Sequence, residues 1–127
     1  MYIDKINKLK LSPKIRIVDE YIPNEEIGVY FAAADLVVQP YINASGSGIS
    51  QIAYGFDRPV IATNVGSLPD VVENGTNGRI VKPGDVHSLA KAILESLEPL
   101  TLNKLLNNAA KTKDKFTWER MAEIVIG

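Results

Sequence analysis

The stretch DLVVQPYINASGSGISQIAYGFDRPVIATNVGSLPD, residues 35–70, decides the fold of this chain. Two short apolar segments, residues 36–38 and 59–62, have the continuous hydrophobic character of strands that are covered on both faces. Polar or glycine-rich residues follow each of them. The apolar residues between them have the spacing of one helical stripe, formed by Ile49, Ile52, Ala53 and Phe56. We therefore predict a strand, a helix and a second strand parallel to the first.

The rest of the chain alternates between the same two patterns. Two further apolar runs predict strands at residues 15–18 and 78–81. Helical spacing and capping residues, among them Asp85 as an N-terminal cap, predict helices at residues 2–11, 24–34, 69–72, 86–97, 100–116 and 117–125. Helices that alternate with strands indicate an α/β fold with a doubly wound parallel sheet.

Composition limits the class of protein. The 127 residues, 46% of them hydrophobic, suffice for one domain with a buried core. A net charge of -1 gives no general attraction for nucleic acid, so we expect no nucleic-acid partner. The absence of cysteine excludes disulfides, thiolate zinc sites and thiol catalysis. No apolar run approaches the roughly 18–20 residues of a membrane span, and we expect a cytoplasmic protein.

A glycine- and serine-rich segment joins the first strand to the predicted helix. Glycines allow a ligand to approach the backbone closely, and serine hydroxyls and the first N–H groups of a helix are free to donate hydrogen bonds. Open α/β sheets bind ligands at the carboxyl ends of their strands, where this segment lies. The segment predicts a phosphate site formed by Ser45, Gly46, Ser47, Gly48, Ile49 and Ser50. The alternative is a flexible loop with a helix cap.

Three segments carry a resemblance to a known family. They are YIPNEEIGVYFAAADLVVQP, RPVIATNVGSLPDVVENGTNGRIVKPGD and FTWERMAEIV, in that order along the chain. The chain resembles the C-terminal, donor-binding domain of the group 1 (family 4) glycosyltransferases, which are of the GT-B type. The resemblance implies transfer of a sugar from a nucleotide-activated donor, retention of anomeric configuration, and no cofactor or bound metal.

The same resemblance implies a role for individual residues. Residues 45–50 match the turn that faces the donor diphosphate. The residues expected to contact ribose or sugar are Gln51, Val65, Gly66 and Ser67. Those expected to contact the nucleobase are Tyr21 and Ile22. The family has a glycine where Ser67 stands, so serine is tolerated there only if the position needs neither a positive φ nor the close backbone approach that glycine allows.

The sequence also departs from the family pattern. Two glutamates mark the family around this helix, and Ala44 and Ile52 occupy their positions. No catalytic residue is therefore assigned. The neighbouring carboxylates and other chemically capable side chains are interpreted as strand-end, capping, surface or anchoring residues: Asp35, Asp57, Asp70, Lys82, His87 and Trp118.

The family's donor domain has two further strands before anything found here, and an N-terminal acceptor domain. We therefore expect residues 1–127 to form a single partial domain with an incomplete Rossmann-like sheet. The expected ligand is a nucleotide-sugar of the UDP, GDP or ADP type. The unpaired edge at residues 36–38 predicts a homodimer or a rearranged sheet, and the missing domain could place the enzyme at the inner membrane.

Two other functions remain open. The chain could be a non-catalytic module that binds a nucleotide or another subunit, as the missing glutamates would allow. It could also be an unrelated flavodoxin-like or receiver-like domain that binds a phosphorylated ligand, although that reading leaves the ordered family segments unexplained.

Overall fold

The computed structural model describes residues 14–15, 24–43 and 48–112. The helices in this part of the chain are α2 (Asn24–Ala33), α3 (Gly48–Gly55), α4 (Leu68–Val71), α5 (Val86–Ser96) and α6 (Pro99–Thr112). The strands are β1 (Val37–Gln39), β2 (Val60–Thr63) and β3 (Gly78–Val81). The predicted elements at residues 2–11 and 117–125 lie outside the described residues, as does most of the predicted strand at 15–18 and the end of the predicted helix at 100–116.

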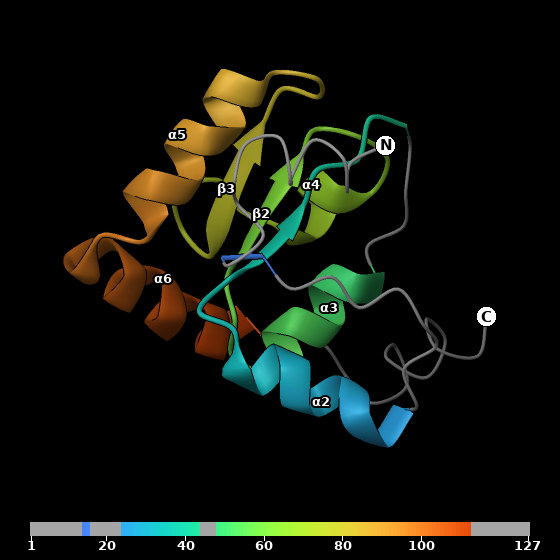
Figure 1. Cartoon of the computed structure of the whole chain (residues 1–127), viewed down its shortest axis with the longest axis vertical. Coiled ribbons are helices and arrows are strands. Elements are labelled where there is room, and N and C mark those ends of the chain that lie inside the picture. The colour runs from blue at the N-terminus through green and yellow to red at the C-terminus, as the bar shows by residue number, and fades with distance from the viewer. Residues whose placement is uncertain (1–13, 16–23, 44–47, 113–127) are drawn as a thin grey trace.

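The described strands form one parallel sheet in the order β1-β2-β3 (Figure 1). Val37 of β1 pairs with Val60 of β2, and Val60 pairs in turn with Gly78 of β3. All three strands therefore end at the same edge of the sheet. The α/β, Rossmann-like parallel sheet that the sequence predicts is confirmed.

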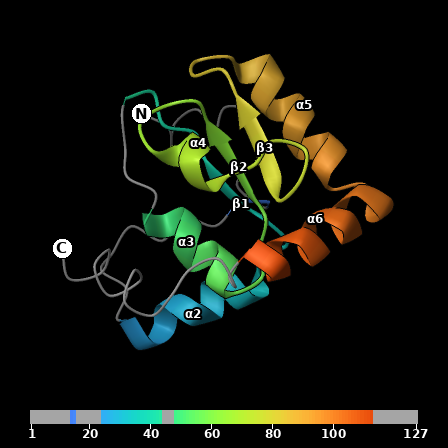
Figure 2. The ribbon, with the colours of Figure 1, turned by 180° about the vertical axis from the view of Figure 1, so that it is seen from behind.

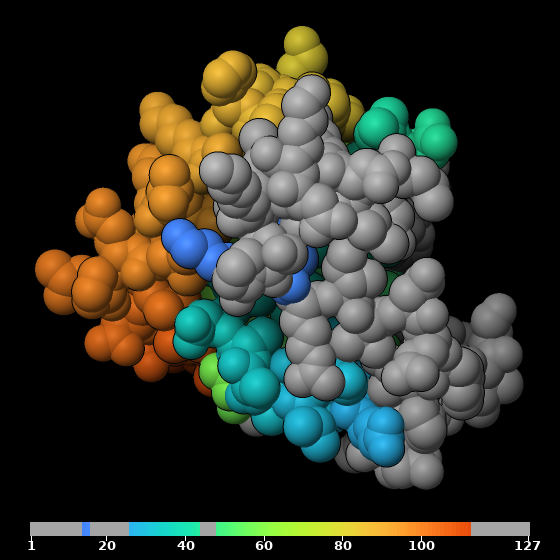
Figure 3. All heavy atoms as spheres, in the orientation of Figure 1, coloured from blue at the N-terminus to red at the C-terminus, as the bar shows by residue number. Residues whose placement is uncertain are grey.

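Helices cover both faces of the sheet, as the views from the two sides show (Figures 1 and 2). On one face, side chains of β2 pack with those of α3, α4 and α6 in a cluster that includes Ala53, Val60, Ala62, Leu68 and Ala109. On the other face, Ile61 and Val81 pack against Ala92 of α5. Alternate residues of β2 thus enter different cores, which is why its four residues are all buried. In the space-filling view α5 and α6 form one flank of the molecule (Figure 3).

Two strand boundaries differ from the prediction by one residue. The strands predicted at 36–38 and 59–62 are Val37–Gln39 and Val60–Thr63, whereas Gly78–Val81 lies where it was expected. The apolar runs end before Gln39 and Thr63, but ladder pairing uses backbone groups, so these polar residues still pair with Ala62 and Val81.

The predicted apolar stripe of α3 is wrong. The residues that α3 buries are Ser50, Gln51, Ala53 and Tyr54, whereas Ile49 and Phe56 are 42% and 39% exposed. Phe56 stacks instead on Phe31 of α2, with ring centroids 5.8 Å apart. The inner face of α3 is partly polar because other parts of the chain supply hydrogen-bond partners for its side chains.

Hydrogen bonds at helix ends fit the capping roles given to two aspartates. The Asp85 carboxylate accepts from the Ser88 backbone N–H at 3.0 Å and from the Ser88 hydroxyl at 2.7 Å, and so caps α5. At the end of α3, Asp57 has φ 60°, and the Arg58 N–H bonds the carbonyl of Ala53 at 2.9 Å. This is the left-handed turn that commonly ends a helix.

Asn77, fully buried just before β3, joins α3, α6 and the backbone at Glu73. Its Oδ1 accepts from the Tyr54 hydroxyl of α3 at 2.9 Å and from the Glu73 N–H at 2.7 Å. Its Nδ2 donates to Thr112 Oγ1 of α6 at 3.0 Å. Burial, with a smaller effect of the Glu73 charge, raises the pKa of Tyr54 far above its usual range, so the phenol stays neutral. Asn77 is thus a structural junction.

Candidate functional site at the carboxyl edge of the sheet

The loops that follow β1 and β2 leave the sheet at its carboxyl edge. The first leads into α3, whose opening residues Gly48, Ile49, Ser50 and Gln51 were predicted as ligand contacts. The second is residues 65–67, which lead into α4. Because β1 and β2 are parallel neighbours and α3 packs against α4, the structure brings these two predicted regions to the same edge. Ser45, Gly46, Ser47, Tyr21 and Ile22 lie outside the described residues.

Buried polar side chains lie beneath this edge. Gln39 ends β1 and Thr63 ends β2, and each is 2% exposed. The hydroxyl of Ser50, in the first turn of α3, donates to Oε1 of Gln39. The hydroxyl of Thr63 donates to the backbone carbonyl of Tyr41 at 2.6 Å. These bonds hold both the start and the end of the loop between β1 and α3.

Gln39 and Thr63 are not among the residues predicted from the sequence. Each is a polar residue that directly follows an apolar strand run, in LVVQ and in VIAT. In a parallel sheet such positions face the ligand edge. That pattern is the signal that would have identified them.

The loop after β2 has the backbone that a site of this kind requires. Gly66 has φ 53°, in the left-handed region that favours glycine, whereas Ser67 has φ -92°. The backbone condition for a serine at position 67 is therefore met, because within this loop the positive φ falls on Gly66.

Charged side chains are distributed unevenly about the sheet. Asp35 and Asp57 precede β1 and β2 and so lie toward the amino edge, away from the candidate site, whereas Asp70 lies in α4 on the carboxyl side. Lys82 follows β3 at the carboxyl edge and, with His87, lines an open pocket of about 640 Å³. The charges of Lys82 and His87 add to the Ser88 hydrogen bonds, the largest effect, in lowering the pKa of Asp85. Lys82 thus adds a cation to the backbone donors at the carboxyl edge.

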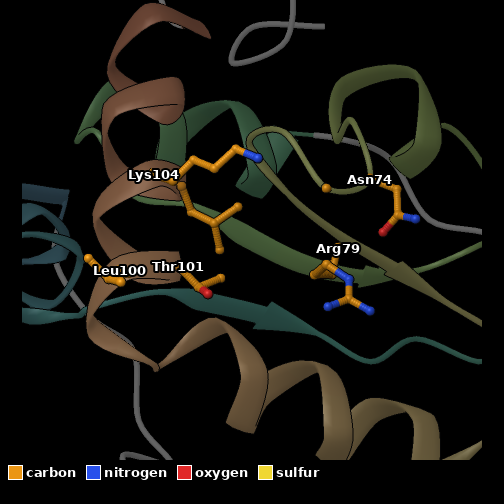
Figure 4. A pocket seen from close by; sticks show the side chains of 7 residues that line it. Asn74, Arg79, Leu100, Thr101 and Lys104 are labelled. Carbon is orange, nitrogen blue, oxygen red and sulfur yellow. The ribbon is translucent and has the colours of Figure 1, made fainter.

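A second pocket, of about 510 Å³, lies toward the opposite edge (Figure 4). Its lining comes from the turn before β3, from β3 itself and from the start of α6: Asn74, Gly75, Arg79, Leu100, Thr101, Lys104 and Leu105. Arg79 also forms an ion pair with Glu95 at 3.5 Å. Since β3 begins at Gly78, this pocket is at the amino edge and is separate from the candidate site.

Neither a metal cluster nor a membrane helix is found among the residues placed in the structure. Within residues 14–15, 24–43 and 48–112, no three His, Cys, Asp or Glu side chains are grouped as metal ligands. No helix in those ranges is long and apolar enough to cross a membrane.

Comparison with known proteins gives a consistent result. Residues 2–99 match the family described as "Glycosyl transferases group 1". D-inositol 3-phosphate glycosyltransferase of Corynebacterium diphtheriae is 32% identical over 123 residues, which are 96% of this chain and 29% of that protein. The chain therefore spans less than a third of the length of this relative.

Two solved structures illustrate the likeness of fold. Sucrose-phosphate synthase of Thermosynechococcus elongatus superposes with a TM-score of 0.85 at 28% identity, over 98% of this chain and 31% of that one. HepE of Anabaena, solved in complex with UDP-glucose, gives a TM-score of 0.81 at 24% identity, over 98% of this chain and 35% of that one.

Proposed function

This chain belongs to the group 1 glycosyltransferases of the GT-B type, and on that premise we propose that it is the donor-binding half of a sugar-transferring enzyme. It binds a nucleotide-sugar of the UDP, GDP or ADP type at the carboxyl edge of the sheet. One observation carries the proposal: the first turn of α3 and the loop 65–67, with its left-handed Gly66, both lie at that edge. The complex of HepE with UDP-glucose supports this ligand class.

Each part of the donor has an assigned contact in this proposal. The diphosphate lies against Ser45, Gly46, Ser47, Gly48, Ile49 and Ser50, where backbone N–H groups and the helix dipole favour an anion. Ribose or sugar contacts come from Gln51, Val65, Gly66 and Ser67, and the nucleobase packs on Tyr21 and Ile22. No resident metal or cofactor takes part in this proposal, as the family resemblance implies.

Transfer requires an acceptor held in line with the donor, and we propose that a second domain supplies it. Residues 1–127 are then a single partial domain that is inactive alone. The intact enzyme retains anomeric configuration and works in polysaccharide or glycoconjugate synthesis, in the cytoplasm and peripheral to the inner membrane through the acceptor domain. The length of the relative, of which this chain covers 29%, supports a longer enzyme.

Titration with nucleotides tests the binding claim. UDP, GDP and ADP are added to the ¹⁵N-labelled chain, and the amides of residues 48–51 and 66–67 are expected to shift with one of them. Amides of residues 74–79, at the amino edge, serve as the internal reference. Lys104→Ala, in the pocket at the amino edge, is the matched control and should leave the affinity unchanged. If none of the three nucleotides shifts the carboxyl-edge amides, the proposed function fails.

Ala44, at the position where the family has the glutamate that supports transfer, favours a second candidate: a module that binds a nucleotide without supporting transfer. The two are separated by assaying sugar transfer in a protein that joins this chain to an acceptor domain. Binding without turnover selects the module.

A homodimer through β1 remains part of the proposal. Among the described strands β1 lies at the edge of the sheet and pairs on one side only, with β2. An available strand edge can pair with another chain. Light scattering that gives the mass of one chain at all concentrations would reject association.

A further inference from the structure

Gln39 and Ser50 form a buried polar pair where β1 ends and α3 begins. Gln39 is 2% exposed, Ser50 is fully buried, and the Ser50 hydroxyl donates to Oε1 of Gln39. Eleven residues separate the two in sequence. The bond therefore ties the first turn of α3 directly to the strand end, across the loop that connects them.

Stability alone does not account for this pair. Nε2 of Gln39 is buried and has no hydrogen-bond acceptor among the described residues. A buried N–H group without an acceptor destabilises a fold by about 1–3 kcal/mol. The neighbouring residues on this face of the sheet, Val37 and Ala62, are apolar, so an apolar side chain at position 39 would avoid that penalty. Polar groups kept at such a cost are typical of functional positions.

The location of the pair suggests its use. The first turn of a helix binds an anion through backbone N–H groups, and these donate well only if the turn faces the ligand. Small displacements of such a turn weaken binding, because hydrogen bonds depend steeply on angle. Ser50 lies in that turn, and Gln39 is the residue that holds it.

We infer that Gln39 is a positioning residue of the donor site, an inference that rests on the proposed function. Through Ser50 it holds the first turn of α3 in the orientation that presents its N–H groups to the donor diphosphate. Gln39 acts through the helix and not on the reacting atoms. The inference concerns recognition of the diphosphate and leaves the nucleobase contacts unaffected.

Three variants separate positioning from packing: Gln39→Met, Ser50→Ala and the double variant. Methionine matches glutamine in length, and replacing both polar partners by apolar groups can be nearly neutral for stability. The double variant is therefore expected to melt within a few degrees of the wild type, whereas Gln39→Met alone leaves the Ser50 hydroxyl without its Gln39 acceptor. Tyr54→Phe is the control, because it removes a hydrogen bond from the other end of the same helix.

The measurement compares two ligands: the nucleoside diphosphate that the wild type binds, and the matching nucleoside without phosphates. In the double variant, affinity for the nucleoside diphosphate should fall about tenfold, which corresponds to a loss of about 1.4 kcal/mol, while affinity for the nucleoside stays unchanged. Tyr54→Phe should lower the melting temperature without changing the ratio of the two affinities.

Two results for the double variant would overturn the inference while leaving the proposed function intact. One is wild-type affinity for the diphosphate, and the other is an equal loss for both ligands, since either means that the pair only packs. A wild type that binds none of the nucleotides overturns the proposed function and this inference together, before any variant is compared.

Discussion

The Thr63 hydroxyl donates a 2.6 Å hydrogen bond to the backbone carbonyl of Tyr41, so the buried end of β2 holds the exposed start of the loop after β1. The two residues are 22 apart in sequence. Parallel strands place their following loops side by side, and this bond fixes the two loops relative to each other. The Thr63 side chain thus holds the start of the loop after β1, as Gln39 holds the first turn of α3 at its end.

Replacing Thr63 by valine keeps the shape of the side chain and removes the donor. We expect the free energy of unfolding to fall by about 1 kcal/mol. Hydrogen exchange of residues 41–43 should accelerate, and nucleotide affinity should weaken, because the loop loses its fixed start. Thr76→Val, in the exposed turn before β3, is the control and should change neither quantity. Unchanged exchange at residues 41–43 would contradict the role given to Thr63.

Gly78 has no room for a side chain. A Cβ atom there would lie 1.9 Å from the carbonyl oxygen of Val60 on the neighbouring strand. Gly78→Ala must therefore force β3 away from β2, and we expect a loss of at least about 2–3 kcal/mol in unfolding free energy. Gly55→Ala is the matched control, since a Cβ there would meet nothing within 4 Å, and it should be neutral or slightly stabilising. Chemical denaturation of both variants makes the comparison.

Gly66 and Ser67 should respond in opposite ways to substitution. Gly66→Ala places a side chain on a residue with φ 53°, which is expected to destabilise the fold by about 1 kcal/mol and to weaken nucleotide binding. Ser67→Gly restores the family's residue at a position with φ -92°, and we expect little change in nucleotide affinity. Thermal melting and nucleotide titration test the pair. A Ser67→Gly variant that binds more weakly than Gly66→Ala would refute the reading of this loop.

The capping carboxylate of Asp85 predicts a pH-dependent contribution to stability. Hydrogen bonds from Ser88 lower the pKa of Asp85 below its ordinary value of 3.8. Because the folded state lowers this pKa, the stabilisation is fully present above 3.8 and is lost as the pH falls through the folded value. Asp85→Ala should therefore lower the melting temperature at pH 7, and the difference from wild type should shrink below pH 3.8. A difference that is constant with pH would show that the charge plays no part.

Features determined by nearby residues could be read from the sequence. The Asp85 cap depends on Ser88, three residues away, and the strand Gly78–Val81 is a short apolar run bounded by turn residues. The buried face of α3 could not be read in this way. Its serine and tyrosine are buried because their partners, Gln39 and Asn77, come from positions 11 and 23 residues away. A local hydrophobic pattern contains no information about such partners.

The same limit applies to the candidate site. Glycines, serines and a preceding strand mark the first turn of α3 as a predicted ligand contact, whereas the role predicted for the loop 65–67 came from the family resemblance. The sequence did not identify Gln39 and Thr63, since their importance arises only when β1 and β2 lie side by side. A local or family pattern was thus enough to propose ligand contacts, whereas the residues that hold these segments in place could not be proposed from such a pattern.

The junction at Asn77 has a consequence for how the molecule opens. Tyr54 of α3 bonds to Oδ1 and Thr112 of α6 bonds to Nδ2 of the same buried amide, so detachment of either helix takes a hydrogen-bond partner from the side chain on which the other helix is held. Local unfolding of the two should therefore be one cooperative event with a single opening free energy. The helix α3, which begins at the candidate site, would then open at the same rate as α6, which lies near the other end of the described chain.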